Sequence, residues 1–60
     1  MALIELLEIT DENTNVNIYN LEGDLISYYD GKNSINEKLN KIPIFQISIS
    51  NNILNITISV

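Results

Sequence analysis

The sequence predicts a small α+β domain in which a four-stranded antiparallel sheet carries two short helices on one face, in the order α-β-β-α-β-β. Apolar and polar residues alternate along 14–30 and 42–60, and this period of two is typical of strands with one buried face. Helix-forming residues or helix-capping signals occupy 2–9 and 33–42. A chain of 60 residues is the size of one domain, so we expect 1–60 to fold as a single unit.

Residues 2–9 are expected to form the first helix. Ala, Leu and Glu favour helices, and Leu3 and Leu7 are four residues apart, which places them on one helical face beside Ile4. Strict alternation fails here because Leu6 and Leu7 are adjacent. A buried strand is the alternative interpretation, since short apolar runs fit both structures.

Residues 14–30 are expected to form a hairpin. Val16 and Ile18 alternate with asparagines before a turn at 20–24. Asn20 suits the first position of a type I turn and Gly23 suits the left-handed residue after it, which predicts a three-residue loop with a bulge.

This loop predicts the register of the first hairpin. The buried face would carry the pairs Ile18–Ile26 and Val16–Tyr28, and the opposite face the pair Tyr19–Leu25. A two-residue loop at Glu22-Gly23 is the alternative, and it would place Ile18 opposite Ser27.

Residues 33–42 are expected to form the second helix, on the sheet. Ser34 and Glu37 have the spacing of a capping box. Ile35 and Leu39 follow at helical spacing, and Pro43 disfavours helix at the residue before it.

Residues 42–60 contain no charged side chain in nineteen positions and are expected to form a second hairpin. A two-residue Asn51-Asn52 loop is predicted, because Asn tolerates the positive φ of a type I′ turn. The expected apolar pairs are Ile49–Leu54, Ile47–Ile56 and Phe45–Ile58.

The composition limits the chemistry. The chain has no Cys and no His, so disulfides, ordinary zinc and haem sites and the common nucleophile–base pairs are excluded, and we expect neither an enzyme nor a cofactor. A domain of this size buries only about 60% of its unfolded surface, which predicts self-association, as a homodimer. The apolar start is interrupted by Glu5 and Glu8 and lacks a basic segment, so a cytoplasmic protein without a membrane span is expected.

Charge is distributed unevenly. Residues 1–30 contain seven acids and no base, and the net charge is −5. With no Arg and three Lys, the chain lacks the donors that phosphates and base edges require, so direct nucleic-acid binding is not expected.

The candidate interaction residues are Tyr19, Glu22, Asp24, Tyr29 and Asp30. Tyr19 and Tyr29 are expected to share the solvent-side face with Leu25, a composition typical of interface centres. Cross-strand packing of the tyrosines, and turn acids that are simply solvated, are the alternatives.

The last hairpin also predicts an interaction. Beyond Pro43 it has none of the lysines, prolines or bulges that normally protect an edge strand. Such a strand would pair with a second copy or with an extended segment of another protein; alternatively, it lies inside the sheet.

The Leu-Leu segment, the acidic loop before Val16 to Tyr19, Gly23, a short helix and a closing Ile-x-Ile hairpin together resemble small phage and prophage proteins of low-GC bacteria. The resemblance implies a phage accessory protein without catalytic residues. We therefore expect a protein that binds a host or phage protein, and more specifically a counter-defence inhibitor such as an anti-CRISPR. The alternatives are a nucleotide-sized ligand held near Lys32 and Ser34, and a structural oligomer.

Overall fold

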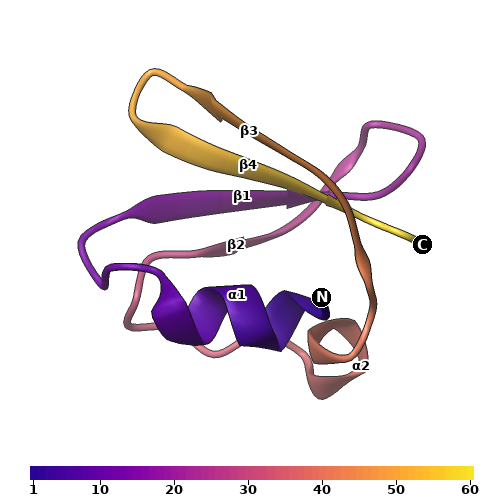
Figure 1. Cartoon of the computed structure of the whole chain (residues 1–60), viewed down its shortest axis with the longest axis horizontal. Helices are drawn as coiled ribbons and strands as arrows, with labels where there is room; N and C mark the ends of the chain where they lie inside the picture. The colour runs from indigo at the N-terminus through magenta and orange to yellow at the C-terminus, as the bar shows by residue number, and fades with distance from the viewer.

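The computed structural model describes all of residues 1–60 and shows an α+β domain with one four-stranded sheet and two helices. Both helices lie on the same side of the sheet (Figure 1). The elements in chain order are α1 (Leu3–Ile9), β1 (Asn15–Tyr19), β2 (Leu25–Tyr29), α2 (Glu37–Asn40), β3 (Ile44–Ser50) and β4 (Ile53–Ile58).

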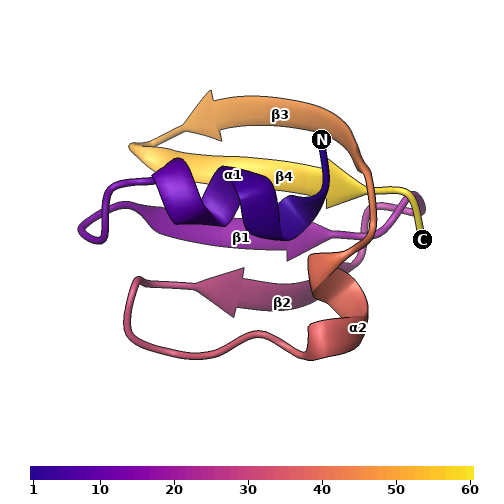
Figure 2. The ribbon, with the colours of Figure 1, turned by 60° about the horizontal axis from the view of Figure 1, so that its bottom comes forward.

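The sheet is mixed, so the prediction of a wholly antiparallel sheet is wrong. The strand order is β2-β1-β4-β3. Each hairpin is antiparallel, but β1 and β4 join the hairpins as a parallel pair, with Val16 opposite Leu54 and Ile18 opposite Ile56. The two central strands lie side by side under α1, which buries their inner faces (Figure 2).

The core is small. Six of 60 residues are buried, and they come from α1 and the two central strands. They are Leu3, Leu7, Val16, Ile18, Ile56 and Ile58. Half-buried residues of the other elements, among them Tyr29, Ile35 and Leu39, pack around them. No helix of the structure has both the length and the apolar composition to cross a membrane.

The first helix is confirmed, with Leu3 and Leu7 facing the core. At its start the carboxylate of Glu5 accepts a hydrogen bond from the Ala2 N–H at 2.9 Å, which satisfies a donor that the helix leaves free. The segment before α1 also pairs with the start of the second hairpin, because Ala2 forms an antiparallel bridge with Pro43.

The second helix is shorter than predicted. It covers one turn, and its cap is Asn36, whose side chain accepts from the Lys38 N–H at 3.0 Å. The Ser34–Glu37 capping box is therefore wrong. The asparagine is the residue immediately before the helical turn, where its short side chain reaches the free N–H groups.

The turn of the first hairpin forms as predicted, but the register differs. Gly23 has φ +90° and its N–H bonds to the Asn20 carbonyl at 3.0 Å. Tyr19 pairs with Leu25 as expected, whereas Ile18 lies opposite Ser27 because the register shifts by one residue between Ile18 and Tyr19. Ile26 is the extra residue.

Because of this extra residue, the residues of β2 that follow it point to the opposite faces from those predicted. Val16 pairs with Tyr29, and Asn17 pairs with Tyr28. The predicted pairs Ile18–Ile26 and Val16–Tyr28 are therefore wrong, and Tyr29, not Tyr28, packs on the core.

The second hairpin confirms the pairs Ile49–Leu54 and Ile47–Ile56. Asn51 and Asn52 have φ of 53° and 64°, as a type I′ turn requires. The pair Phe45–Ile58 is wrong, because a bulge at Phe45 places Ile44 opposite Ile58.

Candidate binding surface

The face of the sheet that points away from the helices is uncovered (Figure 1). We call it the open face. Strand alternation and the observed pairing place on it the residues Asn15, Asn17, Tyr19, Leu25, Tyr28, Gln46, Ser48, Ser50, Ile53, Asn55 and Thr57. None of these residues is charged.

Aromatic and apolar side chains concentrate on the β2 side of the open face. Leu25 is 58% exposed and Tyr28 is 57% exposed, so both present most of their surface to solvent. Tyr19 lies on β1 beside them and is held in place, because its hydroxyl donates to the Asn55 Oδ1 at 3.3 Å. Apart from the half-buried Ile53, the rest of the face is amide and hydroxyl.

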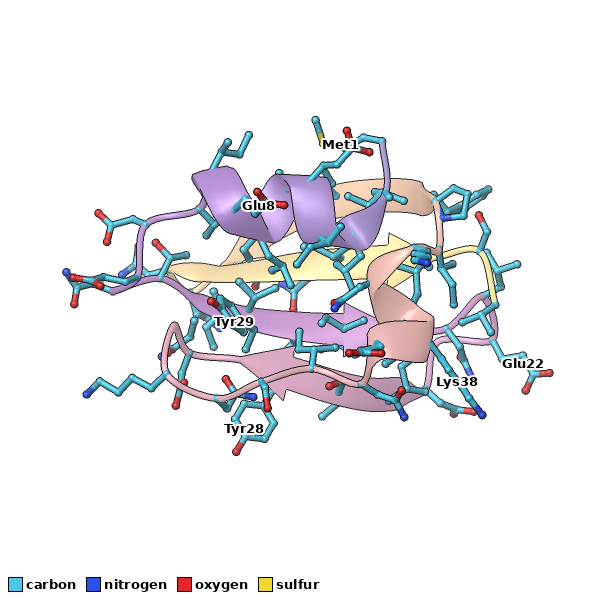
Figure 3. The ribbon with its side chains drawn as sticks, turned by 90° about the horizontal axis from the view of Figure 1, so that it is seen from below. Met1, Glu8, Glu22, Tyr28, Tyr29 and Lys38 are labelled. Atoms are coloured by element: carbon cyan, nitrogen blue, oxygen red, sulfur yellow. The ribbon has the colours of Figure 1, made fainter.

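The two tyrosines predicted to act together lie on opposite faces. Tyr19 is on the open face, whereas Tyr29 is on the helix side and packs against the core. Figure 3 shows Tyr29 toward α1 and Tyr28 away from it. The predicted register places Tyr28 on the buried face, but the structure places it on the open face. The bulge at Ile26 causes the exchange, and nothing in the alternating pattern marks it.

Glu22 and Asp24 lie in the β1–β2 turn, at one end of the sheet (Figure 3). The Oδ1 of Asn20 accepts from both of their backbone N–H groups, at 3.0 Å and 2.9 Å. This bond pattern fixes the backbone of the turn and leaves both carboxylates exposed.

Asp30 follows β2 at the opposite end of the sheet. Its carboxylate accepts from the N–H groups of Lys32 and Asn33, at 2.9 Å and 3.1 Å. These backbone bonds hold the pKa of the Asp30 carboxyl below its usual value, because they stabilise the ionised form. Asp30 thus organises the loop after β2. The five candidate residues therefore occupy separate places: the two ends of the sheet and its two faces.

A cavity of about 500 Å³ lies between α1, α2 and the end of β2. Its apolar wall consists of Ile4, Leu7, Tyr29 and Ile35, and its polar wall of Glu8, Asn33, Ser34, Glu37 and Asn40. The only charges that line it are carboxylates, which repel phosphate. The arrangement suits a neutral or cationic ligand better than a nucleotide.

Comparisons with protein-family models, with curated proteins and with solved structures find no match to this chain.

Proposed function

We propose that this protein is non-catalytic and acts by binding another protein through the open face. The observation that carries the proposal is that a whole face of the sheet is uncovered and has no charged side chain, although the chain has a net charge of −5. A partner that covers this face would therefore not remove water from any charged side chain of this protein, a process that is unfavourable.

The composition of the open face supports a protein as the partner. Charged residues are depleted and tyrosines enriched at the centres of protein interfaces. Tyr, Ser and Asn together supply rigid contact area and adaptable hydrogen bonds, as they do in antibody binding sites. Nucleic acid is a poor fit, because no Lys lies on this face to contact phosphate.

The acids flank the open face. Glu22 and Asp24 lie beyond one end and Asp30 beyond the other, so a partner with a basic rim would approach faster at low salt. A host nucleic-acid-binding protein has such a rim. A phage or prophage accessory protein that inhibits host defence is the concrete form of this proposal. The resemblance to small phage proteins supports the source, and the uneven distribution of charge supports the inhibitory contact.

The proposal is tested by placing one positive charge on the open face. Tyr28→Arg puts it at the centre of the exposed aromatic area. Leu21→Arg is the matched control: Leu21 is an exposed apolar residue, but it lies in the β1–β2 turn. Each protein is immobilised and exposed to lysate of a low-GC bacterium at 50 mM and 500 mM NaCl, and circular dichroism checks its fold.

The expected result is a protein retained by the natural chain and by Leu21→Arg at low salt, and lost from Tyr28→Arg. Retention should fall as salt rises. Equal retention by all three proteins would place the contact elsewhere, and no retained protein at either salt concentration would contradict protein binding.

The cavity beside α2 favours a second candidate, the binding of a small ligand. The cavity wall is mostly polar and its two charged residues are both acids, Glu8 and Glu37. Their carboxylates favour a cationic ligand. Thermal-shift screening of amines against nucleotides tests this candidate; stabilisation by nucleotides alone would contradict the charge argument.

A further inference from the structure

The two edges of the sheet are protected to different extents. At the β2 edge, the Asn33 side chain donates to the Tyr28 carbonyl at 2.8 Å, and the loop that leads to α2 runs alongside (Figure 2). At the β3 edge, the Ile44 N–H donates to the Met1 carbonyl, and the Leu3 N–H donates to the Ile42 carbonyl just before the strand. No backbone bond from outside the β4 ladder reaches residues 46–50. This half of β3 is a free edge.

The backbone groups of Ile47 and Ile49 point out of the sheet along this edge. Ser50 and Ile53 close the two-residue turn, and the closing pair of such a turn is hydrogen-bonded. Because hydrogen-bonded pairs alternate in an antiparallel ladder, Ser48 and Gln46 also bond to β4. The N–H and C=O groups of the two isoleucines between them are therefore available to a further strand.

An apolar stripe runs along the same edge on the helix side of the sheet. Ile47 is 46% exposed and Ile49 is 76% exposed, although they lie opposite the buried Ile56 and the half-buried Leu54. Helix α1 lies over β1 and β4 and does not extend over β3 (Figure 2).

Helix α1 contributes to the stripe. At about 100° per residue, Leu6 and Ile9 lie on one flank of α1, whereas Ile4 and Glu8 lie on the other flank, in the wall of the cavity beside α2. Leu6 and Ile9 therefore face the β3 side, and Ile9 is 74% exposed.

We propose that the β3 edge is a self-association site, where a second copy of the chain pairs antiparallel to β3 about a two-fold axis at Ser48. Ile47 of each copy lies opposite Ile49 of the other, and each such pair exchanges both of its N–H···O bonds. The isoleucines of both copies meet on the helix side, between the two α1 helices. This is a closed, isologous interface.

Charge indicates that the occupant is a second copy. A chain with net charge −5 repels its own copies, and the contact that avoids this repulsion is one without acids. No residue of β3 is charged, so pairing of the two edges brings no carboxylate into the strand-to-strand contact.

The alternation of the strand selects the register. Residues opposite each other in an antiparallel pair lie on the same face of the sheet. An isoleucine of one copy can therefore lie opposite an isoleucine of the other only in a register that pairs odd-numbered residues of β3 with odd-numbered residues. With the two-fold axis at Ser48, both Ile47 and Ile49 of each copy lie opposite an isoleucine of the other copy. Moving the axis to Ile47 pairs Ile49 with the bulged Phe45, and moving it to Ile49 pairs Ile47 with Asn51 of the turn.

The dimer would extend the sheet across both copies and place their open faces on one side. This inference is independent of the proposed function, because β3 pairs along its edge whether or not the open face binds a partner.

The first experiment compares Ile49→Lys with Leu21→Lys by analytical ultracentrifugation over a range of concentrations. Both variants change the net charge equally and replace an exposed apolar residue, but only the first places lysines in the contact. The natural chain and Leu21→Lys are expected to dimerise with rising concentration, with at least a tenfold weaker association for Ile49→Lys. A natural chain that stays monomeric to millimolar concentration, or an unchanged dimer in Ile49→Lys, would overturn the proposal. Growth into larger assemblies would also overturn it and favour a structural oligomer.

The second experiment tests the register and holds even if Ile49→Lys fails to fold. Ser48→Cys places the only two thiols of the dimer at the axis, in a non-hydrogen-bonded pair with Cα atoms about 4.5 Å apart, which a disulfide spans. Gln46→Cys is the control, because in this register the two thiols lie about 14 Å apart along the strands. Mild oxidation is expected to cross-link Ser48→Cys alone. Equal cross-linking of both variants, or none in Ser48→Cys, would contradict the register.

Discussion

Replacing Ile56, Ile47 and Ile49 by alanine, one at a time, removes the same side-chain atoms from three depths of one sheet. Ile56 is fully buried in β4, Ile47 lies opposite it in β3 and is 46% exposed, and Ile49 is 76% exposed. The structure therefore predicts a graded loss of unfolding free energy in the monomer.

The magnitudes follow from burial. The atoms lost from a fully buried isoleucine are worth about 2.4 kcal/mol at about 0.8 kcal/mol per carbon, and the remaining cavity brings the cost of Ile56→Ala to about 3–4 kcal/mol. Scaling by burial gives about 1.3 kcal/mol for Ile47→Ala and about 0.6 kcal/mol for Ile49→Ala. A chain of 60 residues has a total stability of about 3–9 kcal/mol, so Ile56→Ala should lose from about a third of it to all of it.

Urea unfolding followed by far-ultraviolet circular dichroism measures the series, at micromolar concentration so that the monomer dominates. The order of stability should be Ile49→Ala, then Ile47→Ala, then Ile56→Ala. A loss in Ile49→Ala as large as that in Ile56→Ala would refute the assignment of β3 as an uncovered edge.

Further predictions concern the turns and Asp30. Asn52→Gly should raise stability by about 0.5–1 kcal/mol in urea unfolding, because glycine adopts the φ of 64° without strain. Gly23→Ala should cost about 1–2 kcal/mol, since its φ is +90° and its surroundings are open. Gly31→Ala has nearly the same φ, +88°, but its Cβ would collide with the Glu12 carbonyl, so it should cost about 1–3 kcal/mol more; equal losses would contradict the packing of these two loops. The lowered pKa of Asp30 means that its contribution to stability is present above the unfolded value and is lost as pH falls through the folded value. A carboxyl NMR titration should therefore give a midpoint below 3.8.

The two hairpins and the first helix could be predicted because their signals are local. Alternation marks the strands, and Gly23 and the Asn51-Asn52 pair mark turns that need positive φ. The parallel join of β1 to β4 has no local signal, since either strand of each hairpin could pair with the other hairpin. The parallel join brings the inner faces of β1 and β4 together under α1, which is a contact between segments far apart in the chain.

The candidate residues show a different limit of sequence reasoning. A bulge adds one residue to a strand without changing its composition, so the exchange of Tyr28 and Tyr29 between faces could not be predicted from the pattern. The absence of charged residues from 42–60 is evident in the sequence, and this segment contains both the free edge of β3 and part of the open face. The position of Glu22 and Asp24 far from Asp30 follows directly from the length of β2.

Amide hydrogen exchange along β3 tests the free edge most directly. At low protein concentration the amides of Gln46, Ser48 and Ser50 should be protected by β4, whereas those of Ile47 and Ile49 should exchange rapidly. At high concentration both isoleucine amides should become protected. Protection of Ile47 and Ile49 in the dilute monomer, or rapid exchange at every concentration, would contradict the account.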